Sequence, residues 1–283
     1  MTCAWQSFLS ILPLWMRQDV DRLGKDHLQE LRLRLNMPPI LRTSNGDIPL
    51  KRNVTAEDMH FCVNIASQYS PWTASTAIHG YVTAPGGHRI GLCGRAGSSA
   101  GCITGIHAIT SLCLRVARDY PGIASNIPIE LSSVLIIGSP GCGKTTLLRD
   151  LIRNRSNSGS LCAVVDEREE IFPRVNDAFC FSPGRNTDVL SGSSKAEGIN
   201  MVLRTMSPEV IAIDEITEKD DCLALLHAGW CGVTLVATAH AGSRADLENR
   251  PIYRPILASR LFDTVIILKK DKSWYAERLN TCI

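Results

Sequence analysis

The chain has 283 residues, which is long for one hydrophobic core and suits two domains. Its hydrophobic fraction of 45% excludes a largely disordered protein. Because 30 Lys and Arg residues nearly balance 28 Asp and Glu residues, the net charge of +2 excludes nucleic-acid binding through the charge of the whole molecule. The 11 cysteines are scattered without a Cys-x-x-Cys pair, so neither a zinc site nor a disulfide framework is predicted.

Residues 1–120 predict a smaller α+β domain. The apolar stretch 3–16 lacks the features of a signal peptide and is too short to span a bilayer, so we expect an amphipathic helix that packs on this domain or on a partner. An Asn-Gly pair and a Pro-Gly-Gly run predict β-hairpins at 40–51 and 81–93. Thr55, followed three residues later by an aspartate, predicts a capped helix.

The second part of the chain predicts an α/β domain with a mostly parallel sheet. Turn-forming residues concentrate in 121–130, which we interpret as a linker. Residues 131–283 then contain short, almost wholly apolar runs, as is typical of strands buried on both faces. The predicted strands are Val134–Ile137, Leu161–Val165, Val210–Ile213, Val233–Ala237 and Thr264–Leu268. The predicted helices are Lys144–Asn154, Lys195–Thr205 and Glu218–Trp230.

Residues 138–145 match the phosphate-loop pattern GxxxxGK[ST], between a predicted strand and a predicted helix. Glycines let the backbone wrap around phosphates, and the unpaired amides of the helix N-terminus face negative charge. We expect Lys144 to reach the terminal phosphates and Thr145 to ligate Mg²⁺. The predicted nucleotide-binding residues are Gly138, Ser139, Pro140, Gly141, Cys142, Gly143, Lys144, Thr145 and Thr146. ATP is the expected nucleotide, since no NKxD-type guanine-reading motif follows.

Polar side chains follow three further predicted strands, at the sheet edge where ligands bind in open α/β folds. Asp214 is expected to hold Mg²⁺, and Glu215 to activate water. His240 is expected to sense the terminal phosphate. Asp166 and Glu167 begin a third, acidic cluster. The alternatives are a helix cap for the first acidic pair, a structural role for the histidine and a solvated charged face for the cluster.

In this order, the motifs resemble the Walker A motif, aspartate box, Walker B motif and histidine box of the secretion-ATPase superfamily of type II and type IV systems. The chain is similar in particular to the stage III sporulation protein AA family. The segments that carry this resemblance include 31–34, 80–83, 87–91, 109–112, 166–168, 184–190, 195–198 and 204–209.

The resemblance implies a RecA/AAA+-like P-loop NTPase that hydrolyses ATP with Mg²⁺ and acts as a motor or assembly ATPase. It implies a ring-shaped homo-oligomer, a hexamer, at the base of a membrane-embedded channel between mother cell and forespore. The chain would then be cytoplasmic and recruited to the membrane by a channel protein.

The resemblance also assigns site residues. Asp166 and Glu167 belong to the aspartate box, and Glu170 aligns with a glutamate that activates water, so Glu170 and Glu215 both remain candidates for the base. Arginines of the N-terminal domain can reach a nucleotide bound to a neighbouring subunit. The candidates for this role in trans are Arg89, Arg95, Arg115 and Arg118.

Two other functions use the same motifs. A nucleic-acid-stimulated RecA-like ATPase would need a basic patch, for which the candidates are Arg32, Arg34, Arg42, Lys51 and Arg52. The near-neutral charge and low aromatic content argue against it, so no nucleic acid is expected as a partner. A non-catalytic assembly protein, in which nucleotide only orders the ring, is the other alternative.

Overall fold

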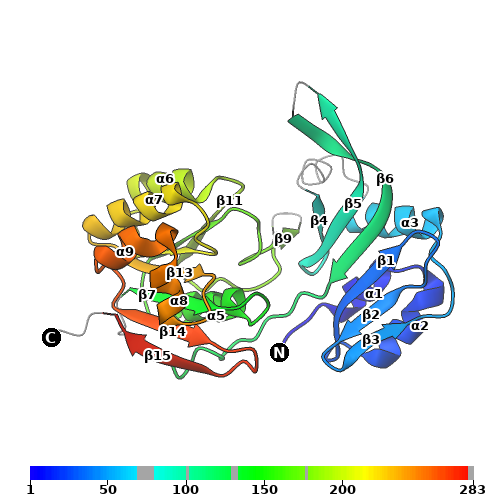
Figure 1. Ribbon diagram of the computed structural model, residues 1–283, viewed down its shortest axis with the longest axis horizontal. Helices are drawn as coiled ribbons and strands as arrows, with labels where there is room; N and C mark the ends of the chain where they lie inside the picture. The colour runs from blue at the N-terminus through cyan, green and yellow to red at the C-terminus, as the bar shows by residue number, and fades with distance from the viewer. Residues whose placement is uncertain (69–79, 100–101, 129–132, 176–177, 280–283) are drawn as a thin grey trace. The chain divides into compact units, whose positions relative to one another are not determined.

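The computed structural model describes residues 1–68, 80–99, 102–128, 133–175 and 178–279, and its chain divides into two compact units (Figure 1). Unit 1 comprises Met1–Asp119 and Pro173–Cys180, and unit 2 comprises Tyr120–Phe172 and Phe181–Ile283. The chain therefore leaves unit 2 after Phe172 and re-enters it at Phe181. Within this excursion, β9 (Arg174–Val175) and β10 (Ala178–Phe179) form a two-stranded antiparallel sheet.

Unit 1 is built on an antiparallel sheet with the strand order β3-β2-β1-β6-β5-β4. Its strands are β1 (Leu28–Arg34), β2 (Ile40–Thr43), β3 (Gly46–Pro49), β4 (Tyr81–Ala84), β5 (His88–Ser99) and β6 (Cys102–Arg115). Its helices are α1 (Trp5–Ile11), α2 (Leu14–Leu23) and α3 (Ala56–Ala66). Because side chains alternate along a strand, Leu31 and Leu33 enter the core with the helices, while Arg32 and Arg34 point to the other face. This is the predicted α+β domain.

The apolar N-terminal stretch forms two helices instead of one. Pro13, which cannot continue a helix, lies between them as the N-cap of α2. Phe8, Ile11 and Met16 are 0% exposed in the core of unit 1, so the stretch packs on its own domain, as one of the two expectations had it. Among the described residues, no helix combines the length and the apolarity needed to cross a membrane.

Both predicted hairpins are present. In the first, Thr43 pairs with Gly46, so the turn comes one residue earlier than the Asn-Gly pair predicted; only the glycine of that pair has a positive φ, at 125°. The capped helix is confirmed as α3. The Thr55 hydroxyl accepts from Asp58 N, and the Asp58 carboxylate accepts from Thr55 N.

Unit 2 contains a seven-stranded sheet with the order β11-β8-β12-β13-β7-β14-β15. All its pairings are parallel except that of β15 with β14. Its strands are β7 (Val134–Gly138), β8 (Cys162–Asp166), β11 (Thr187–Ser191), β12 (Val210–Ile213), β13 (Thr234–Ala239), β14 (Thr264–Leu268) and β15 (Trp274–Arg278). Its helices are α5 (Lys144–Asn157), α6 (Lys195–Thr205), α7 (Lys219–Trp230), α8 (Arg244–Asn249), η1 (Pro251–Tyr253) and α9 (Arg254–Ala258). The predicted α/β class with a mostly parallel sheet is confirmed.

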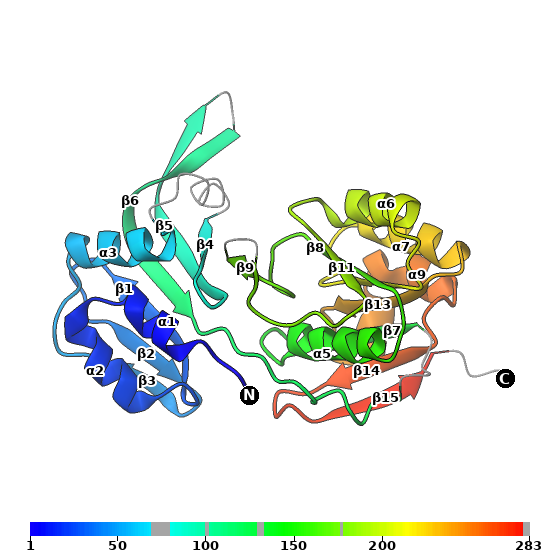
Figure 2. The ribbon, with the colours of Figure 1, turned by 180° about the vertical axis from the view of Figure 1, so that it is seen from behind.

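Helices cover both faces of this sheet (Figures 1 and 2). Leu135 and Ile137 belong to a core cluster shared with α6, α7 and α9. The alternate residues, Val134 and Ile136, point to the opposite face, where α5 lies. Burial on both faces explains why the strands are almost continuously apolar.

His88 of unit 1 is a buried histidine that holds the N-terminal segment in place. It is 0% exposed; its Nε2 donates to Ala4 O at 2.9 Å and its Nδ1 accepts from Ala117 N at 3.0 Å. Burial lowers the pKa of His88 to about 4. At a pH between about 4 and ~6.5, the imidazole is therefore neutral in the folded protein but protonated in the unfolded chain.

This depressed pKa predicts a pH dependence of stability. The unfolded state binds more protons than the folded state below pH ~6.5, so the contribution of His88 is complete above that pH and is lost as the pH falls toward about 4. When the pH is lowered from 7 to 4.5, the free energy of unfolding, measured with urea, should fall by about 2 kcal/mol more in the wild type than in His88→Gln. Equal losses in the two proteins would contradict the depressed pKa.

Candidate functional site

The glycine-rich loop joins the wholly buried strand β7 to helix α5. Gly141 and Gly143 have φ angles of 75° and 106°, which glycine adopts without steric cost. A Cβ atom on Gly138 would lie 2.5 Å from Cys142 Sγ, so this close approach also requires glycine. Cys142 is only 1% exposed and packs behind the loop.

Lys144, the first residue of α5, has its ammonium held inside the loop. Its Nζ donates to Gly138 O at 3.0 Å, to Ser139 O at 3.4 Å and to His240 Nδ1 at 3.1 Å. These three bonds use all three donors of the ammonium. The side chain is thus poised at the mouth of the loop and paired with the predicted histidine.

The Asp214 carboxylate joins three elements at the carboxyl edge of the sheet. Its Oδ2 accepts from Thr145 Oγ1 at 2.6 Å, and its Oδ1 accepts from Thr238 Oγ1 at 2.5 Å. Thr145 belongs to α5 and Thr238 to β13, while Asp214 follows β12. The hydroxyl and carboxylate oxygens of Thr145 and Asp214 are the hard ligands that Mg²⁺ prefers beside water and phosphate oxygens, so this donor set fits the ion.

Thr238 is a site residue to which the sequence analysis assigned no role. Strand β13 lies between β7 and β12, so its end comes between the glycine-rich loop and the acidic pair. Besides binding Asp214, the Thr238 hydroxyl accepts from Glu215 N at 2.8 Å. The available signal was a hydroxyl near the end of the strand that delivers His240, two residues before that histidine.

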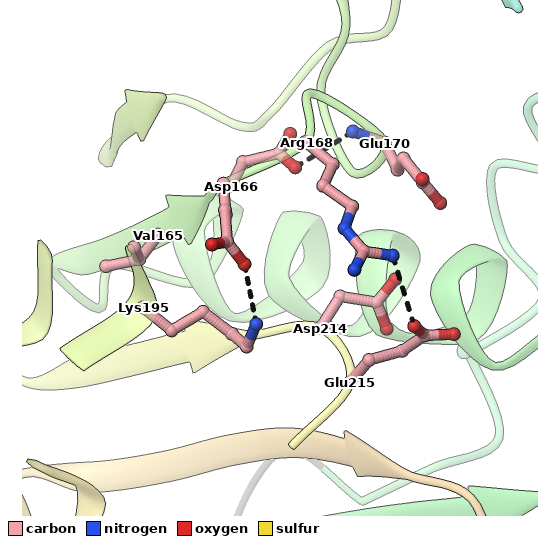
Figure 3. A pocket seen from close by; sticks show the side chains of 8 residues that line it. Val165, Asp166, Arg168, Glu170, Lys195, Asp214 and Glu215 are labelled. Atoms are coloured by element: carbon pink, nitrogen blue, oxygen red, sulfur yellow. Dashed lines mark hydrogen bonds and ion pairs between the residues drawn. The ribbon is translucent and has the colours of Figure 1, made fainter. Parts of the chain in front are cut away.

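The Glu215 carboxylate contacts one side chain from each of two neighbouring segments. His240 Nε2 lies 2.8 Å from Glu215 Oε1, and Arg168 Nη1 lies 3.8 Å from Glu215 Oε2. The Arg168 and Glu215 side chains point toward each other beside Asp214 (Figure 3). Since His240 Nδ1 accepts from Lys144, a proton on Nε2 satisfies both bonds of the ring. A continuous chain of contacts therefore runs from Lys144 to Glu215.

The turn after β8 is organised by Asp166. Its carboxylate is buried and accepts from Glu170 N, Ile171 N and Phe172 N at 2.8 to 3.0 Å. Burial is the largest influence and raises the pKa of Asp166 to about 6, although the bonds from Phe172 N and Ile171 N act in the opposite direction. Asp166 therefore shapes the turn that carries Glu170.

A hollow at this edge of the sheet is lined by residues from the end of β8 and the turn after it, from the segment after β12 and from the start of α6. They are Val165, Asp166, Glu167, Arg168, Glu170, Lys195, Asp214 and Glu215 (Figure 3). The structure thus brings Glu170 and Glu215, the two candidate bases, to one place. Among the described residues, no three His, Cys, Asp or Glu side chains form a cluster that could hold a metal by themselves. A Mg²⁺ ion here would thus need oxygens from a bound phosphate and water.

The four candidate arginines all belong to unit 1. Arg118 donates to the carbonyls of Lys25 and Leu28. Arg89 lies over the ring of Tyr81, with its Cζ 4.0 Å from the ring centroid. The two exposed members of the set are Arg95 and Arg115.

The family model for "Sporulation stage III, protein AA" matches residues 6–276. The chain belongs to this family. It is 37% identical over 276 residues to stage III sporulation protein AA of Bacillus subtilis (strain 168), covering 93% of this chain and 90% of that protein. The predicted family is confirmed.

Solved structures of an ATPase and of a pilus retraction motor share the fold of this member of the sporulation stage III protein AA family. The ATPase DotB of Legionella pneumophila superposes with a TM-score of 0.57 at 17% identity, covering 94% of this chain and 80% of that one. The pilus retraction motor PilT with bound ADP superposes with a TM-score of 0.62 at 16% identity, covering 93% and 82%. The predicted P-loop NTPase fold is confirmed.

Replacing Thr238 by the isosteric valine tests the junction at Asp214. Thr238→Val leaves Asp214 without one donor and Glu215 N without its acceptor, in a position that is 0% exposed. We expect the free energy of unfolding, measured with urea, to fall by about 1–3 kcal/mol. Thr234→Val, at the start of the same strand, is the matched control and should change stability by less than about 0.5 kcal/mol. Equal stability of the two variants would contradict the hydrogen bonds that Thr238 makes with Asp214 and Glu215.

Proposed function

We propose that this chain is a Mg²⁺-dependent ATPase that works in sporulation as a ring-shaped motor or assembly ATPase at a membrane channel. The observation that carries the proposal is the convergence of Lys144, the Thr145–Asp214 pair and the His240–Glu215 pair at one sheet edge. The relative in Bacillus subtilis supports the sporulation role by its name. The ADP bound to PilT, which shares this fold, supports an adenine nucleotide as ligand.

Binding would begin with the glycine-rich loop and Lys144. The Lys144 ammonium already lies at the mouth of the loop, and it would exchange its bond to His240 for the terminal phosphates of ATP. Thr145 and Asp214 would hold Mg²⁺, which when bound neutralises phosphate charge. Breaking the Lys144–His240 bond would free His240 Nδ1, which donates to the terminal phosphate in a form of the ring that carries a proton there, and this fits a sensing role.

We assign the role of base to Glu215. Its carboxylate is oriented by His240 Nε2 at 2.8 Å, so it stands one side chain away from the phosphate-binding lysine. A carboxylate placed in this way orients a water and accepts its proton as the water attacks. Glu170 lines the same hollow and is assigned to a second position around that water.

Assembly would complete the site. In the proposed ring, Arg95 or Arg115 reaches a nucleotide bound to a neighbouring subunit, because both are exposed. The contacts of Arg118 with the carbonyls of Lys25 and Leu28 favour a structural role for that arginine. Turnover per subunit would therefore rise with protein concentration.

The contacts of the basic residues of unit 1 favour the ATPase over a nucleic-acid-stimulated motor. Arg32 Nε lies 2.6 Å from Glu30 Oε1, and Arg42 Nε lies 3.1 Å from Asp47 Oδ1. Arg52 stacks over the ring of Trp15. The carboxylates paired with Arg32 and Arg42 offset part of the positive charge that a nucleic acid would meet.

Two substitutions test the function. Lys144→Ala removes the phosphate contact, and we expect it to weaken ATP binding by about tenfold or more. Glu215→Gln keeps the size of the side chain but removes the base, so ATP should still bind while turnover falls by about 100-fold or more. Turnover is measured as phosphate release at several protein concentrations, and binding by equilibrium titration. Glu170→Gln, measured alongside, should lower turnover less than Glu215→Gln does.

The matched controls are Arg204→Ala, in the last turn of α6, and Glu248→Gln, both at exposed positions. Both should bind and hydrolyse ATP as the wild type does. If the wild type released phosphate no faster than Lys144→Ala at every concentration, hydrolysis would be refuted. If the wild type still bound ATP under those conditions, the result would favour the alternative of a non-catalytic assembly protein.

A further inference from the structure

Lys195, the first residue of α6, is a buried cation at the carboxyl edge of the sheet of unit 2. Its side chain is 7% exposed, and its Nζ lies 2.6 Å from Glu167 Oε2 and 3.7 Å from Asp221 Oδ2. Burying an ammonium group is costly unless carboxylates compensate its charge. The proposed function, as stated above, gives this residue no role.

One partner of Lys195 belongs to the segment that carries Glu170. Glu167 begins the turn after β8 and lies three residues before Glu170. Glu169 N donates to Asp166 O at 3.2 Å, and Glu170 N donates to the Asp166 carboxylate at 2.9 Å, so hydrogen bonds close the turn on both sides of Glu167. Fixing Glu167 therefore fixes the position of Glu170.

The other partner belongs to the segment that carries Glu215. Asp221 Oδ2 accepts from Thr217 N at 2.9 Å and from Glu218 N at 3.1 Å, and so caps helix α7. Thr217 lies two residues after Glu215. The Asp221 side chain is 6% exposed, and the Lys195 ammonium lies beside it, 3.7 Å from Oδ2.

The backbone in both segments is strained. Glu169 and Glu215 have φ angles of 53° and 52°, in the left-handed region that residues with a side chain adopt at a cost. Such conformations persist only where the surroundings hold them. Lys195 contacts both segments, and it lines the same hollow as Glu170 and Glu215 (Figure 3).

We propose that Lys195 is a positioning residue for hydrolysis: by pairing with Glu167 and Asp221, it sets the separation between the Glu170 and Glu215 segments. The inference rests on the proposed ATPase function. Lys195 acts through these two carboxylates and not by touching the nucleotide. A displacement of about 1 Å at a reacting group can cost about 100-fold in rate, so a residue of this kind affects turnover far more than binding.

The test compares Lys195→Met and Lys195→Arg in the full chain. Methionine keeps the length of the side chain without its charge, and we expect kcat to fall by about 30- to 100-fold while the Kd for ATP changes by less than about threefold. Arginine keeps the charge and can pair with both carboxylates, so it should restore kcat to within about fivefold of the wild type. Lys219→Met, at the exposed start of α7, is the matched control and should leave both constants unchanged.

A double variant separates positioning from folding. Lys195→Met leaves the Glu167 carboxylate without its cation, and Glu167→Gln in the same chain removes that charge. The double variant should regain thermal stability relative to Lys195→Met, but its kcat should remain low because the two segments are still unlinked. Recovery of kcat together with stability would show that the lysine only stabilises the fold, and would overturn the proposal.

The remaining outcomes are also decisive. A kcat for Lys195→Met within about twofold of the wild type overturns the positioning role. Loss of ATP binding in proportion to the loss of kcat does the same, because it indicates a general disruption of the site. If the wild type binds ATP without hydrolysing it, the proposed function itself is wrong and the inference falls with it; measuring the wild type first tells these cases apart.

Discussion

Two short hydrogen bonds to Asp214 hold together the elements from which the candidate site is built. Thr145 brings the start of α5 to the carboxylate, and Thr238 brings the end of β13. The glycine-rich loop and the acidic pair lie one strand apart because β13 separates β7 from β12 in the sheet, and the two bonds bridge that separation. Thr238 also fixes Glu215 N, and His240, farther along the same chain, continues the bridge from Glu215 to Lys144. The charged residues at the carboxyl edge of the sheet are thus held by hydrogen bonds to one another. The sheet beneath them is packed on both faces, which makes it rigid.

Helix α5 also anchors the three places where the chain passes between the two units. The Asp150 carboxylate accepts from Gly122 N and Ala124 N, just after the chain enters unit 2. Arg149 donates to the carbonyls of Glu170 and Ile171, just before the excursion to unit 1 begins. After the return, Arg149 stacks on the ring of Phe181 and Arg153 donates to Ser182 O. The helix that begins at Lys144 therefore contacts residues of unit 2 next to each of these three connections.

The sequence predicted the parts of this protein that depend on local pattern. Apolar runs gave the parallel strands, and the pattern from Gly138 to Thr145 gave the loop, because burial and phosphate binding each impose their own residue types. Strand β11 was missed because its residues are only partly buried at the edge of the sheet, which removes the apolar signal. The roles of Thr238 and Lys195 depend on strand order and on partners distant in the chain, which spacing in the sequence does not encode. The N-terminal stretch forms two helices in place of the one predicted because Pro13, which cannot continue a helix, divides it.

The account is tested most directly by the metal dependence of nucleotide binding. A fluorescent, non-hydrolysable ATP analogue is titrated into the full chain with Mg²⁺ or with EDTA, for the wild type and for Asp214→Asn. We predict that Mg²⁺ tightens binding to the wild type by about tenfold or more, equivalent to about 1.4 kcal/mol, and leaves binding to Asp214→Asn almost unchanged. Equal affinity of the wild type with Mg²⁺ and with EDTA, or an undiminished response to Mg²⁺ in Asp214→Asn, would contradict the site built around Thr145 and Asp214.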